Sequence, residues 1–333
     1  MREILIVLDT IEDKLVRQSL EIITFSKKLL REKSYKIIVL IPGREVEHIC
    51  KSISSMYGVH TVALEHNDLY YPNPELTAEL ICLLINPSLQ GYNPEFIIFT
   101  HTMRNGQIAA KLSVKLCVAV VTSVESFIYD NANFIFQRSV FNAKIKMNVR
   151  VNSSINILTV LSGVSSIPEE AAAAENSSVV NERFNFSVEN YRPQSISRSI
   201  ETDIKLDEAD AIIAAGRGIG DEKNLDLIKE TAALFKNSAV GASRPVCDNK
   251  WLPFSRQVGI TGRIVSPKFY MACGISGSQQ HIAGMKNSLV VAAINKDPNA
   301  AIFSIADYII VDDLLLFLPE FIKRVQEKTT DKG

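Results

Sequence analysis

Short apolar runs alternate with segments of helical period along the first 122 residues. The apolar runs, which predict strands, lie at residues 4–8, 37–41, 61–64, 96–100 and 118–122. The segments of helical period, which predict helices, lie at residues 15–30, 46–53, 76–85 and 105–116. This rhythm is typical of a mainly parallel sheet with helices on both faces, so we expect a doubly wound, Rossmann-like α/β domain.

Four further apolar runs follow with no helical segment between them. They lie at residues 127–129, 134–137, 145–149 and 155–160. Consecutive strands without crossover helices favour antiparallel pairing. The four runs therefore predict an antiparallel addition that closes the first domain near residue 161.

The next segment, residues 162–199, is rich in Ser, Asn and Glu and has few periodic apolar positions, which is typical of a linker or a peripheral excursion. Within it, FNFSV at residues 184–188 is a candidate edge strand. A second α/β unit then begins with a strand at 211–215 and a helix at 222–235. We expect an N-terminal α/β domain over residues 1–161, a linker or peripheral segment over 162–200, and a C-terminal domain over 201–333.

Six polar or glycine-rich turns follow short apolar strands in the second unit. They read GRGIG at 216–220, VGASR at 240–244, VGITG at 258–262, CGISGSQQH at 273–281, AINKD at 293–297 and ADYIIVDDL at 306–314. A single glycine turn is ordinary α/β architecture, and GRGIG does not have the G-x-G-x-x-G spacing. Six such turns at the carboxyl edge of one parallel sheet predict a nucleotide site, because glycine lets the backbone approach a ligand there.

Three side chains in these turns suggest chemistry with an anionic ligand. Ser276 precedes a helix start, where hydroxyl and free N–H groups suit a phosphate, and His281 follows in the same helix. Arg244 comes after Gly-Ala-Ser and before Pro245, which restricts the arginine backbone to extended geometry. Taken singly, a surface arginine or a lone histidine more often has no such role.

Composition narrows the classes of protein. Thirty-six basic and thirty-seven acidic residues give a net charge of -1, and basic runs are lacking, so no nucleic-acid partner is expected. The chain enters an apolar strand without a leader, and no stretch approaches about 18 apolar residues, so we expect a cytoplasmic protein without membrane insertion. Five scattered cysteines without a C-x-x-C pair argue against a disulfide framework, a zinc knuckle or a cysteine-ligated iron–sulfur cluster.

Taken in order, the motifs of the second unit resemble the alpha subunit of the electron-transfer flavoproteins, the FixB-like family. The resemblance runs through GRG, VGASRP, VGxTG, a Pro–x–x–Tyr strand, GISGxxQHxxGM, AINKD and ADYxxVxDL over about residues 209–319. The N-terminal half is similar through HTMRNGQIAAKLSVKLCVAVVTSVE. It departs from the family where FNAK replaces an aromatic–x–Gly–Asn pattern, and in the order of Arg104, Asn105 and Gly106.

The resemblance implies a C-terminal Rossmann-like (DHS-like) domain that holds one noncovalent FAD, with the isoalloxazine ring at the interface with a separate beta subunit. It implies no catalytic residue and no metal ligand. The implied cofactor-binding residues are Arg217, Gly218, Ser243, Arg244, Val258, Gly259, Ile260, Thr261, Gly274, Ile275, Ser276, Gly277, Ser278, Gln279, Gln280, His281, Asn295, Asp297, Asp313 and Leu314.

The family match assigns these residues to parts of the cofactor. Arg217, Ser243 and Ser276 match residues near the ribityl and phosphate groups, and Asn295 and Asp313 match residues at the ADP end. The residues that match the surroundings of the flavin ring are Arg244, Thr261 and His281.

Flavin chemistry agrees with the residues at the ring. Reduction places negative charge at the flavin N1–C2=O edge, so a cation and a hydrogen-bond donor there raise the potential. We expect Arg244 and His281 in that role, with Thr261 donating to N5. Ile260 replaces the glutamine of the common VGQTG motif and removes a side-chain amide beside the ring, which predicts a different potential unless Ile260 is neutral packing.

The function implied is that of an electron carrier. It would accept electrons from flavin dehydrogenases, such as the acyl-CoA dehydrogenases of fatty acid β-oxidation, and pass them to a quinone reductase or another reductase. An electron-bifurcating complex, which oxidises NADH and reduces ferredoxin and an enoyl-CoA, is a second possibility. Two alternatives of other classes are a stand-alone nucleotide-dependent oxidoreductase and a nucleotide sensor, which needs a phosphate loop in the first 130 residues.

Overall fold

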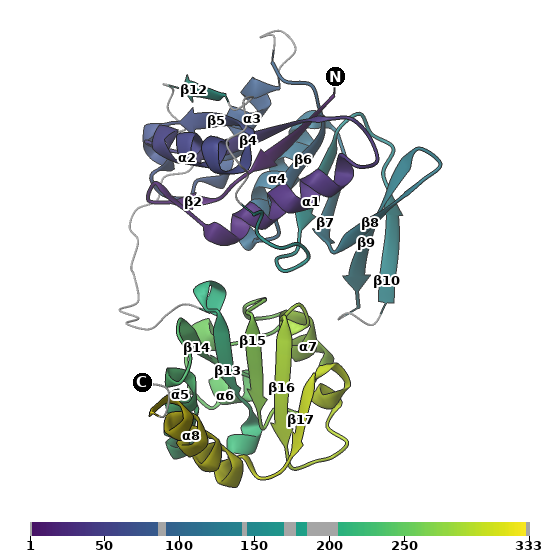
Figure 1. The fold of residues 1–333 in the computed structure, drawn as a ribbon. Coiled ribbons are helices and arrows are strands. Elements are labelled where there is room, and N and C mark those ends of the chain that lie inside the picture. Colours follow the sequence, from purple (N-terminus) through teal and green to yellow (C-terminus); the bar gives the residue numbers. More distant parts are fainter. Residues whose placement is uncertain (1, 86–90, 142–144, 170–177, 185–205, 331–333) are drawn as a thin grey trace. The chain divides into compact units, whose positions relative to one another are not determined.

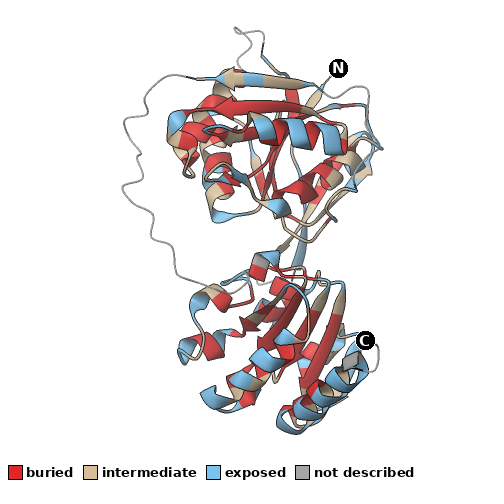
Figure 2. Ribbon diagram, turned by 60° about the vertical axis from the view of Figure 1, so that its left-hand side comes forward, coloured by how far each residue is buried: buried red, intermediate tan, exposed pale blue. Residues whose placement is uncertain are grey.

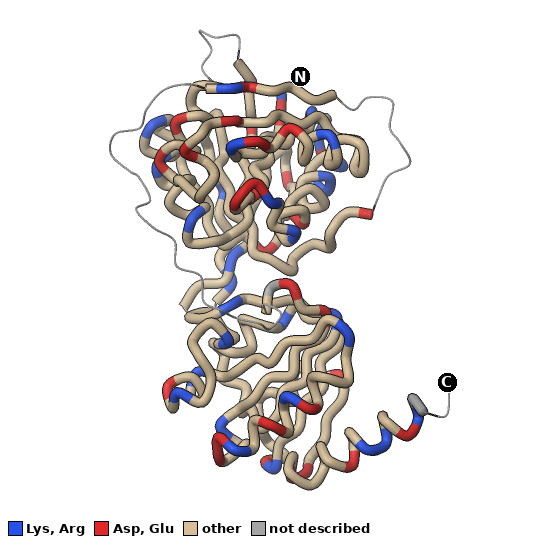
Figure 3. Tube along the Cα trace, turned by 90° about the vertical axis from the view of Figure 1, so that its left-hand side faces the viewer, with Lys and Arg blue, Asp and Glu red and all other residues tan. Residues whose placement is uncertain are grey.

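The computed structural model describes residues 2–85, 91–141, 145–169, 178–184 and 206–330 (Figure 1). The chain forms two compact units. The first unit comprises Met1–Val140 and Lys146–Arg198, and the second comprises Phe141–Ile145 and Ser199–Gly333. Acidic and basic residues are interspersed along both units (Figure 3).

A seven-stranded sheet forms the centre of the first unit, in the order β12-β5-β4-β1-β6-β11-β7, and all its neighbouring strands run parallel. The strands are β1 Glu3–Val7, β4 Lys36–Gly43, β5 His60–Glu65, β6 Pro94–Thr100, β7 Val120–Val124, β11 Asn156–Val160 and β12 Val179–Arg183. The direction of winding reverses between β1 and β6, so their carboxyl ends mark the switch point where such sheets bind ligands.

Helices cover both faces of this sheet because alternate strand residues point to opposite sides. In β1, Ile4 and Ile6 join one hydrophobic cluster, which α1 (Glu21–Leu29) and α2 (Glu47–Tyr57) complete. Leu5 and Val7 join the other, which α3 (Pro74–Leu84) and α4 (Met103–Leu116) complete. Figure 2 shows the buried strands between helices whose outer sides are exposed.

Short elements replace part of one predicted helix near the N-terminus. The segment at residues 15–30 holds the end of a small antiparallel pair, a 3-10 turn and then α1. These short elements are β2 Thr10–Ile11, β3 Lys14–Leu15 and the 3-10 turn Arg17–Leu20.

The antiparallel addition has three strands rather than the four expected. They are β8 Ser126–Asp130, β9 Asn133–Val140 and β10 Ile145–Arg150, in the order β10-β9-β8. The fourth run is β11, which pairs in parallel with both β6 and β7 inside the main sheet, so its assignment was wrong. All five residues of β11 are buried, as expected of a parallel strand covered on both faces.

Part of the segment expected to be a linker is an ordered edge strand. β12 pairs in parallel with β5, and Arg183 of β12 forms an ion pair of 2.9 Å with the buried Glu65. The candidate strand at residues 184–188 begins one residue after β12 ends, and residues 185–188 lie outside the described residues.

The second unit contains a five-stranded parallel sheet in the order β14-β13-β15-β16-β17. Its strands are β13 Ala211–Ala215, β14 Ser238–Ala242, β15 Phe269–Cys273, β16 Val290–Asn295 and β17 Tyr308–Val311. α5 (Leu225–Ala233), α6 (Arg244–Asp248) and α8 (Leu314–Thr330) complete one hydrophobic cluster, and α7 (Gln279–Met285) belongs to the other. Both Rossmann-like halves of the predicted fold are therefore present.

The position of β11 can be tested by truncating a buried side chain. Leu158→Ala should lower the free energy of unfolding of the first unit by about 2–5 kcal/mol, because the side chain is fully buried in the core. Met147→Ala in β10, where the side chain is 40% exposed, should change it by less than about 0.5 kcal/mol. Urea unfolding followed by circular dichroism measures both, and equal small effects would contradict the central position of β11.

Candidate functional site

Polar turns follow the strands of the second unit at one edge of its sheet. Because the strands are parallel, their carboxyl ends meet there. Gly216 follows β13, Ser243 follows β14, Gly274 follows β15 and Asn295 ends β16. A cleft with a volume of about 550 Å³ opens among these turns. This volume falls within the range of about 300–1,000 Å³ that is common for small-molecule sites.

Most of the predicted site residues line this cleft. They are Arg217, Gly218, Ser243, Arg244, Val258, Gly259, Thr261, Gly274, Ile275, Ser276, Ser278, Gln280, His281 and Asn295. These residues come from turns separated by up to about eighty positions in the sequence, and the parallel sheet brings them to one place.

Six predicted residues fall outside the cleft lining. They are Ile260, Gly277, Gln279, Asp297, Asp313 and Leu314. Gly277 has a positive φ, and a Cβ there would lie 2.2 Å from the Ile302 backbone nitrogen, so its role in the fold is steric. Leu314 is buried in the core, and Asp313 forms an ion pair of 2.9 Å with Lys296, which holds the pKa of its carboxyl below the usual value.

Two glycine turns that contribute residues to the cleft approach each other closely. A Cβ on Gly216 would lie 2.1 Å from the carbonyl oxygen of Gly274, and Gly218 donates a backbone hydrogen bond of 3.0 Å to that same oxygen. Gly274 itself has a φ of +65°, which disfavours other residues. The GRG and GISG motifs are therefore two sides of one backbone contact.

Two arginines make the cleft electropositive. Arg217 is exposed, and its guanidinium has no hydrogen-bond or ion-pair partner within the described chain. Arg244 is 67% exposed and lies 3.4 Å from Asp248, measured from Nε to the carboxylate. Asp248 also lines the cleft and offsets part of the Arg244 charge, which the sequence analysis did not anticipate.

His281 is a neutral side chain rather than a cation at neutral pH. It is 4% exposed, and its Nε2 lies 2.9 Å from the hydroxyl of Tyr270. Burial lowers the pKa of His281 to about 4, although the Val258 backbone partly opposes this fall. Its Nδ1 is buried and has no well-formed hydrogen bond to any residue that the structure describes. Thus His281 supplies no positive charge to the cleft at neutral pH, contrary to the cationic role expected from the sequence.

Pro245, Asp248 and Gln257 line the cleft but were not among the predicted residues. Gln257 lies directly before the VGITG turn, and its Nε2 donates a hydrogen bond of 2.9 Å to the hydroxyl of Thr261. Asp248 lies four residues after Arg244 on α6, a spacing that brings side chains together on a helix. That spacing was the available signal for Asp248, whereas a buried glutamine has no comparable sequence signature.

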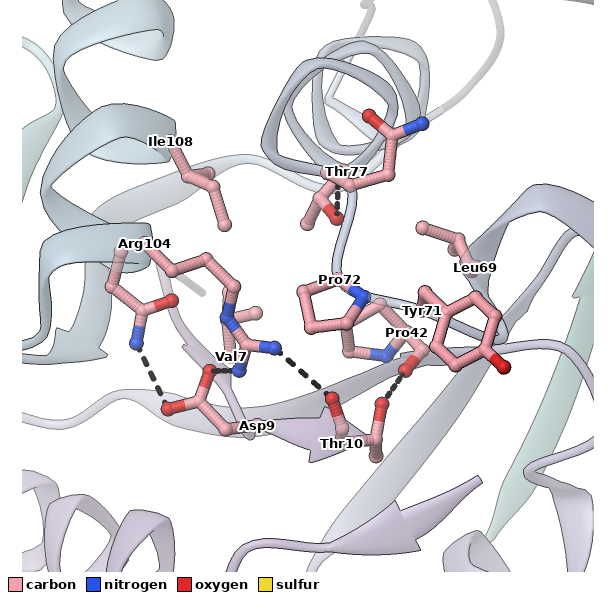
Figure 4. A pocket seen from close by; sticks show the side chains of 12 residues that line it. Val7, Asp9, Thr10, Pro42, Leu69, Tyr71, Pro72, Thr77, Arg104 and Ile108 are labelled. Atoms are coloured by element: carbon pink, nitrogen blue, oxygen red, sulfur yellow. Dashed lines mark hydrogen bonds and ion pairs between the residues drawn. The ribbon is translucent and has the colours of Figure 1, made fainter. Parts of the chain in front are cut away.

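Side chains of the first unit close its own switch point (Figure 4). Arg104 forms an ion pair with Asp9 and donates a hydrogen bond of 3.0 Å to the backbone oxygen of Thr10. Asn105 donates one of 2.9 Å to the other Asp9 carboxylate oxygen. The remaining volume is about 20 Å³, room for roughly one water molecule. Since a phosphate would meet a carboxylate here, the nucleotide-sensor alternative gains no support.

Other classes of site can be examined in the part of the chain that the structure describes. No helix there combines the length and the apolar character needed to cross a membrane. No three His, Cys, Asp or Glu side chains gather there as metal ligands would. In the described cleft lining, the one histidine is bonded to Tyr270 rather than to a serine or threonine hydroxyl.

A parallel α/β unit with glycine turns and two arginines at its carboxyl edge belongs to the nucleotide-binding class. Residues 4–183 match the electron transfer flavoprotein domain, and residues 205–286 match the electron transfer flavoprotein FAD-binding domain. The chain belongs to the electron transfer flavoprotein alpha-subunit family, as the sequence motifs predict.

Relatives extend this likeness over most of the chain. The electron transfer flavoprotein subunit alpha of Thermoanaerobacterium thermosaccharolyticum is 31% identical, over 94% of this chain and 94% of its own. The acryloyl-CoA reductase electron transfer subunit beta of Anaerotignum propionicum is 28% identical, over 98% and 96%. The protein FixB of Clostridium saccharobutylicum is 29% identical, over 95% and 94%.

The buried His281 makes stability depend on pH. Its pKa falls from 6.5 unfolded to about 4 folded, so its contribution is complete above pH 6.5 and is lost as the pH drops toward 4. The loss should reach about 3 kcal/mol, and His281→Gln should remove it. Urea unfolding of both proteins between pH 7 and pH 4 measures the difference. Parallel curves for the two proteins would contradict the assigned burial.

Proposed function

We propose that this chain is the FAD-carrying alpha subunit of a heterodimeric electron-transfer flavoprotein. The cleft of the second unit is the observation that carries the proposal. It combines a volume of about 550 Å³, glycine turns in close contact, two arginines, and two buried polar atoms that have no hydrogen-bond partner among the described residues. FAD is a dinucleotide with a negatively charged pyrophosphate and a polar flavin edge, so it fits a cleft lined by arginines and glycine turns.

The pyrophosphate and ribityl chain would lie against Arg217, Ser243 and Ser276. Arg217 brings a charge that has no partner among the described residues, and both serines line the cleft, Ser243 directly after β14 and Ser276 three residues after β15. Asn295 holds the turn that carries Ser276, because its Nδ2 donates a hydrogen bond of 3.0 Å to the Ile275 backbone oxygen. We assign Asp313 and Asp297 to the ADP end, outside the walls of the cleft itself.

The flavin ring would lie near Arg244, Thr261 and His281. Bound FAD supplies reversible electron uptake and release, and the surrounding charges set how readily it is reduced. Arg244 provides the positive charge, and neutral His281 provides orientation. Thr261 accepts from Gln257, so its own hydroxyl hydrogen remains available to the ligand. Ile260 is 41% exposed and its backbone nitrogen donates to Gln280, which favours a contact at the rim over a contact inside the cleft.

An electron carrier needs partners that donate electrons to it and accept electrons from it. We propose a beta subunit in a cytoplasmic heterodimer, with an acyl-CoA dehydrogenase or another flavin dehydrogenase as donor and a quinone reductase as acceptor. The relative named for acryloyl-CoA reductase favours a second candidate. In that candidate the chain serves a bifurcating complex that oxidises NADH and delivers electrons to ferredoxin and an enoyl-CoA.

Electron delivery distinguishes these candidates. The purified heterodimer should be bleached by an acyl-CoA dehydrogenase reduced with its substrate and should not be reduced by NADH. Bleaching by NADH, coupled to ferredoxin reduction when an enoyl-CoA and its dehydrogenase are added, would select the bifurcating candidate. A heterodimer that neither donor reduces would contradict the proposed function.

Removing the arginine charge should lower the flavin potential. Arg244 is largely exposed and paired with Asp248, so its charge acts on the flavin as it would in water. Two unit charges about 4 Å apart in water interact by about 1 kcal/mol. Arg244→Ala should therefore lower the first reduction potential of the flavin by on the order of 50 mV. Spectroelectrochemical titration measures this shift.

Two control variants separate local charge from other effects. Arg244→Lys keeps the charge and should recover most of the potential. Lys268→Ala removes a charge at the amino end of β15, where Lys268 pairs with Asp210, and should leave the potential nearly unchanged. Equal potentials in Arg244→Ala and the wild type would remove Arg244 from its role.

A further inference from the structure

Tyr270 lies in β15, in the interior of the second unit, and its hydroxyl is bonded to a residue of the cleft. The side chain is fully buried, and β15 is flanked on both sides by parallel strands. The hydroxyl lies 2.9 Å from Nε2 of His281 and has no other hydrogen-bond partner among the described residues. Because a buried hydroxyl needs a partner, Tyr270 depends on His281 for its hydrogen bond.

The direction of this hydrogen bond follows from the atoms available. If Nε2 of His281 carried a hydrogen and donated it to the phenol oxygen, the hydroxyl hydrogen of Tyr270 would be buried without an acceptor, which is unfavourable. If Tyr270 donates instead, both groups are satisfied. Nε2 then carries no hydrogen, and the neutral ring carries its hydrogen on Nδ1.

The surroundings of the other ring nitrogen agree with this tautomer. The Val258 backbone partly opposes the fall in the pKa of His281. Its N–H is already bonded to the Ala242 oxygen at 2.9 Å, so Val258 can act on the imidazole only through its carbonyl oxygen, which is an acceptor. An acceptor suits a hydrogen on Nδ1, although the contact is not a well-formed hydrogen bond.

Neither ring nitrogen of His281 is open to the cleft. The side chain lines the cleft but is only 4% exposed, Nδ1 is buried, and Nε2 is bonded to the fully buried Tyr270. The charged side chains that line the same cleft are Arg217, Arg244 and Asp248, and none of them bonds to His281. A proton could therefore reach Nε2 only if the bond to Tyr270 were given up.

We infer that Tyr270 is a positioning residue of the flavin site, whose hydroxyl donates to Nε2 of His281 and fixes the imidazole as the neutral tautomer with its hydrogen on Nδ1. His281 then supplies no proton when bound FAD is reduced, and the charge of Arg244 offsets the negative charge instead. The effect on the flavin rests on the proposed FAD-carrying function, whereas the tautomer is a property of the chain itself.

The tautomer can be read in the wild-type protein by nitrogen-15 spectra of labelled histidine rings. The chain has five histidines, so the signals of His281 are assigned by their loss in His281→Gln. We expect a protonated Nδ1 and an unprotonated Nε2 at pH 7. A hydrogen on Nε2, or a charged ring at that pH, would overturn the inference.

Removing the hydroxyl tests the effect on the flavin. Tyr270→Phe keeps the ring but takes away the donor that favours an unprotonated Nε2, so the pKa of His281 should rise by about one, a tenfold change in its ionisation constant. An imidazolium beside bound FAD raises its first reduction potential. The pH at which this potential begins to rise on acidification should therefore move up by about one unit in spectroelectrochemical titrations.

Tyr308→Phe is the matched control, because it removes the hydroxyl of an exposed tyrosine in β17. It should change neither the pKa of His281 nor the pH profile of the potential. An unchanged pKa and pH profile in Tyr270→Phe as well would overturn the role of Tyr270 and leave the FAD-carrying function intact.

Two further outcomes are separated by the same measurements. If Tyr270→Phe does not fold, the nitrogen-15 spectrum of the wild type decides the inference without it. A wild-type heterodimer that takes up no FAD would overturn the proposed function and the effect on the flavin, whereas the spectrum of its histidine rings would still test the tautomer.

Discussion

The backbone contact between the turns after β13 and β15 sets the geometry of the candidate site. Gly216 lies where a Cβ would come within 2.1 Å of the Gly274 carbonyl oxygen, and Gly218 hydrogen bonds to the same oxygen. Side chains at these positions would force the two strand ends apart. Arg217 and Ser276, which lie beside this contact, would then no longer line one cleft, so the cleft depends on the close approach of two glycine-containing turns.

The carboxyl edge of the parallel sheet is filled by side chains in the first unit and forms an open cleft in the second. In the first unit the switch point is filled by the Asp9–Arg104 ion pair, and the cavity left is about 20 Å³. In the second unit the cleft is about 550 Å³, and Arg217 is unpaired within the described residues. The larger volume and the uncompensated positive charge of this cleft are why we assign the cofactor to the second unit alone.

The sequence was sufficient for the alternation of strands and helices and for the polar strand ends, because both follow from local patterns. The prediction of antiparallel pairing was wrong for β11. This strand follows three antiparallel strands in the sequence but lies between β6 and β7 in the main parallel sheet. Uniform burial was its distinguishing property, and an apolar run of five residues does not reveal its pairing direction. The edge strand β12 was missed because polar composition dominated the surrounding segment.

Residues that line the cleft were predictable where the backbone requires glycine or where a charged residue follows a strand. The neutral state of His281 was not predictable, since it depends on burial by elements distant in sequence. The pairing of Asp248 with Arg244 follows from their spacing of four residues on a helix. That helix, α6, has only five residues, which are too few for an apolar periodicity to predict it from the sequence. The place of Gln257 in the cleft lining was not predictable either, because only three-dimensional packing supplies it.

The central claim is that the second unit holds FAD, and cofactor analysis of the complex tests it most directly. The chain, purified together with a beta subunit of the same family, should show a flavin absorption spectrum, and the released cofactor should be FAD. One FAD with one AMP per heterodimer is the result expected of a simple carrier, and two FADs would indicate the bifurcating form. A colourless complex that takes up no added FAD would contradict the account.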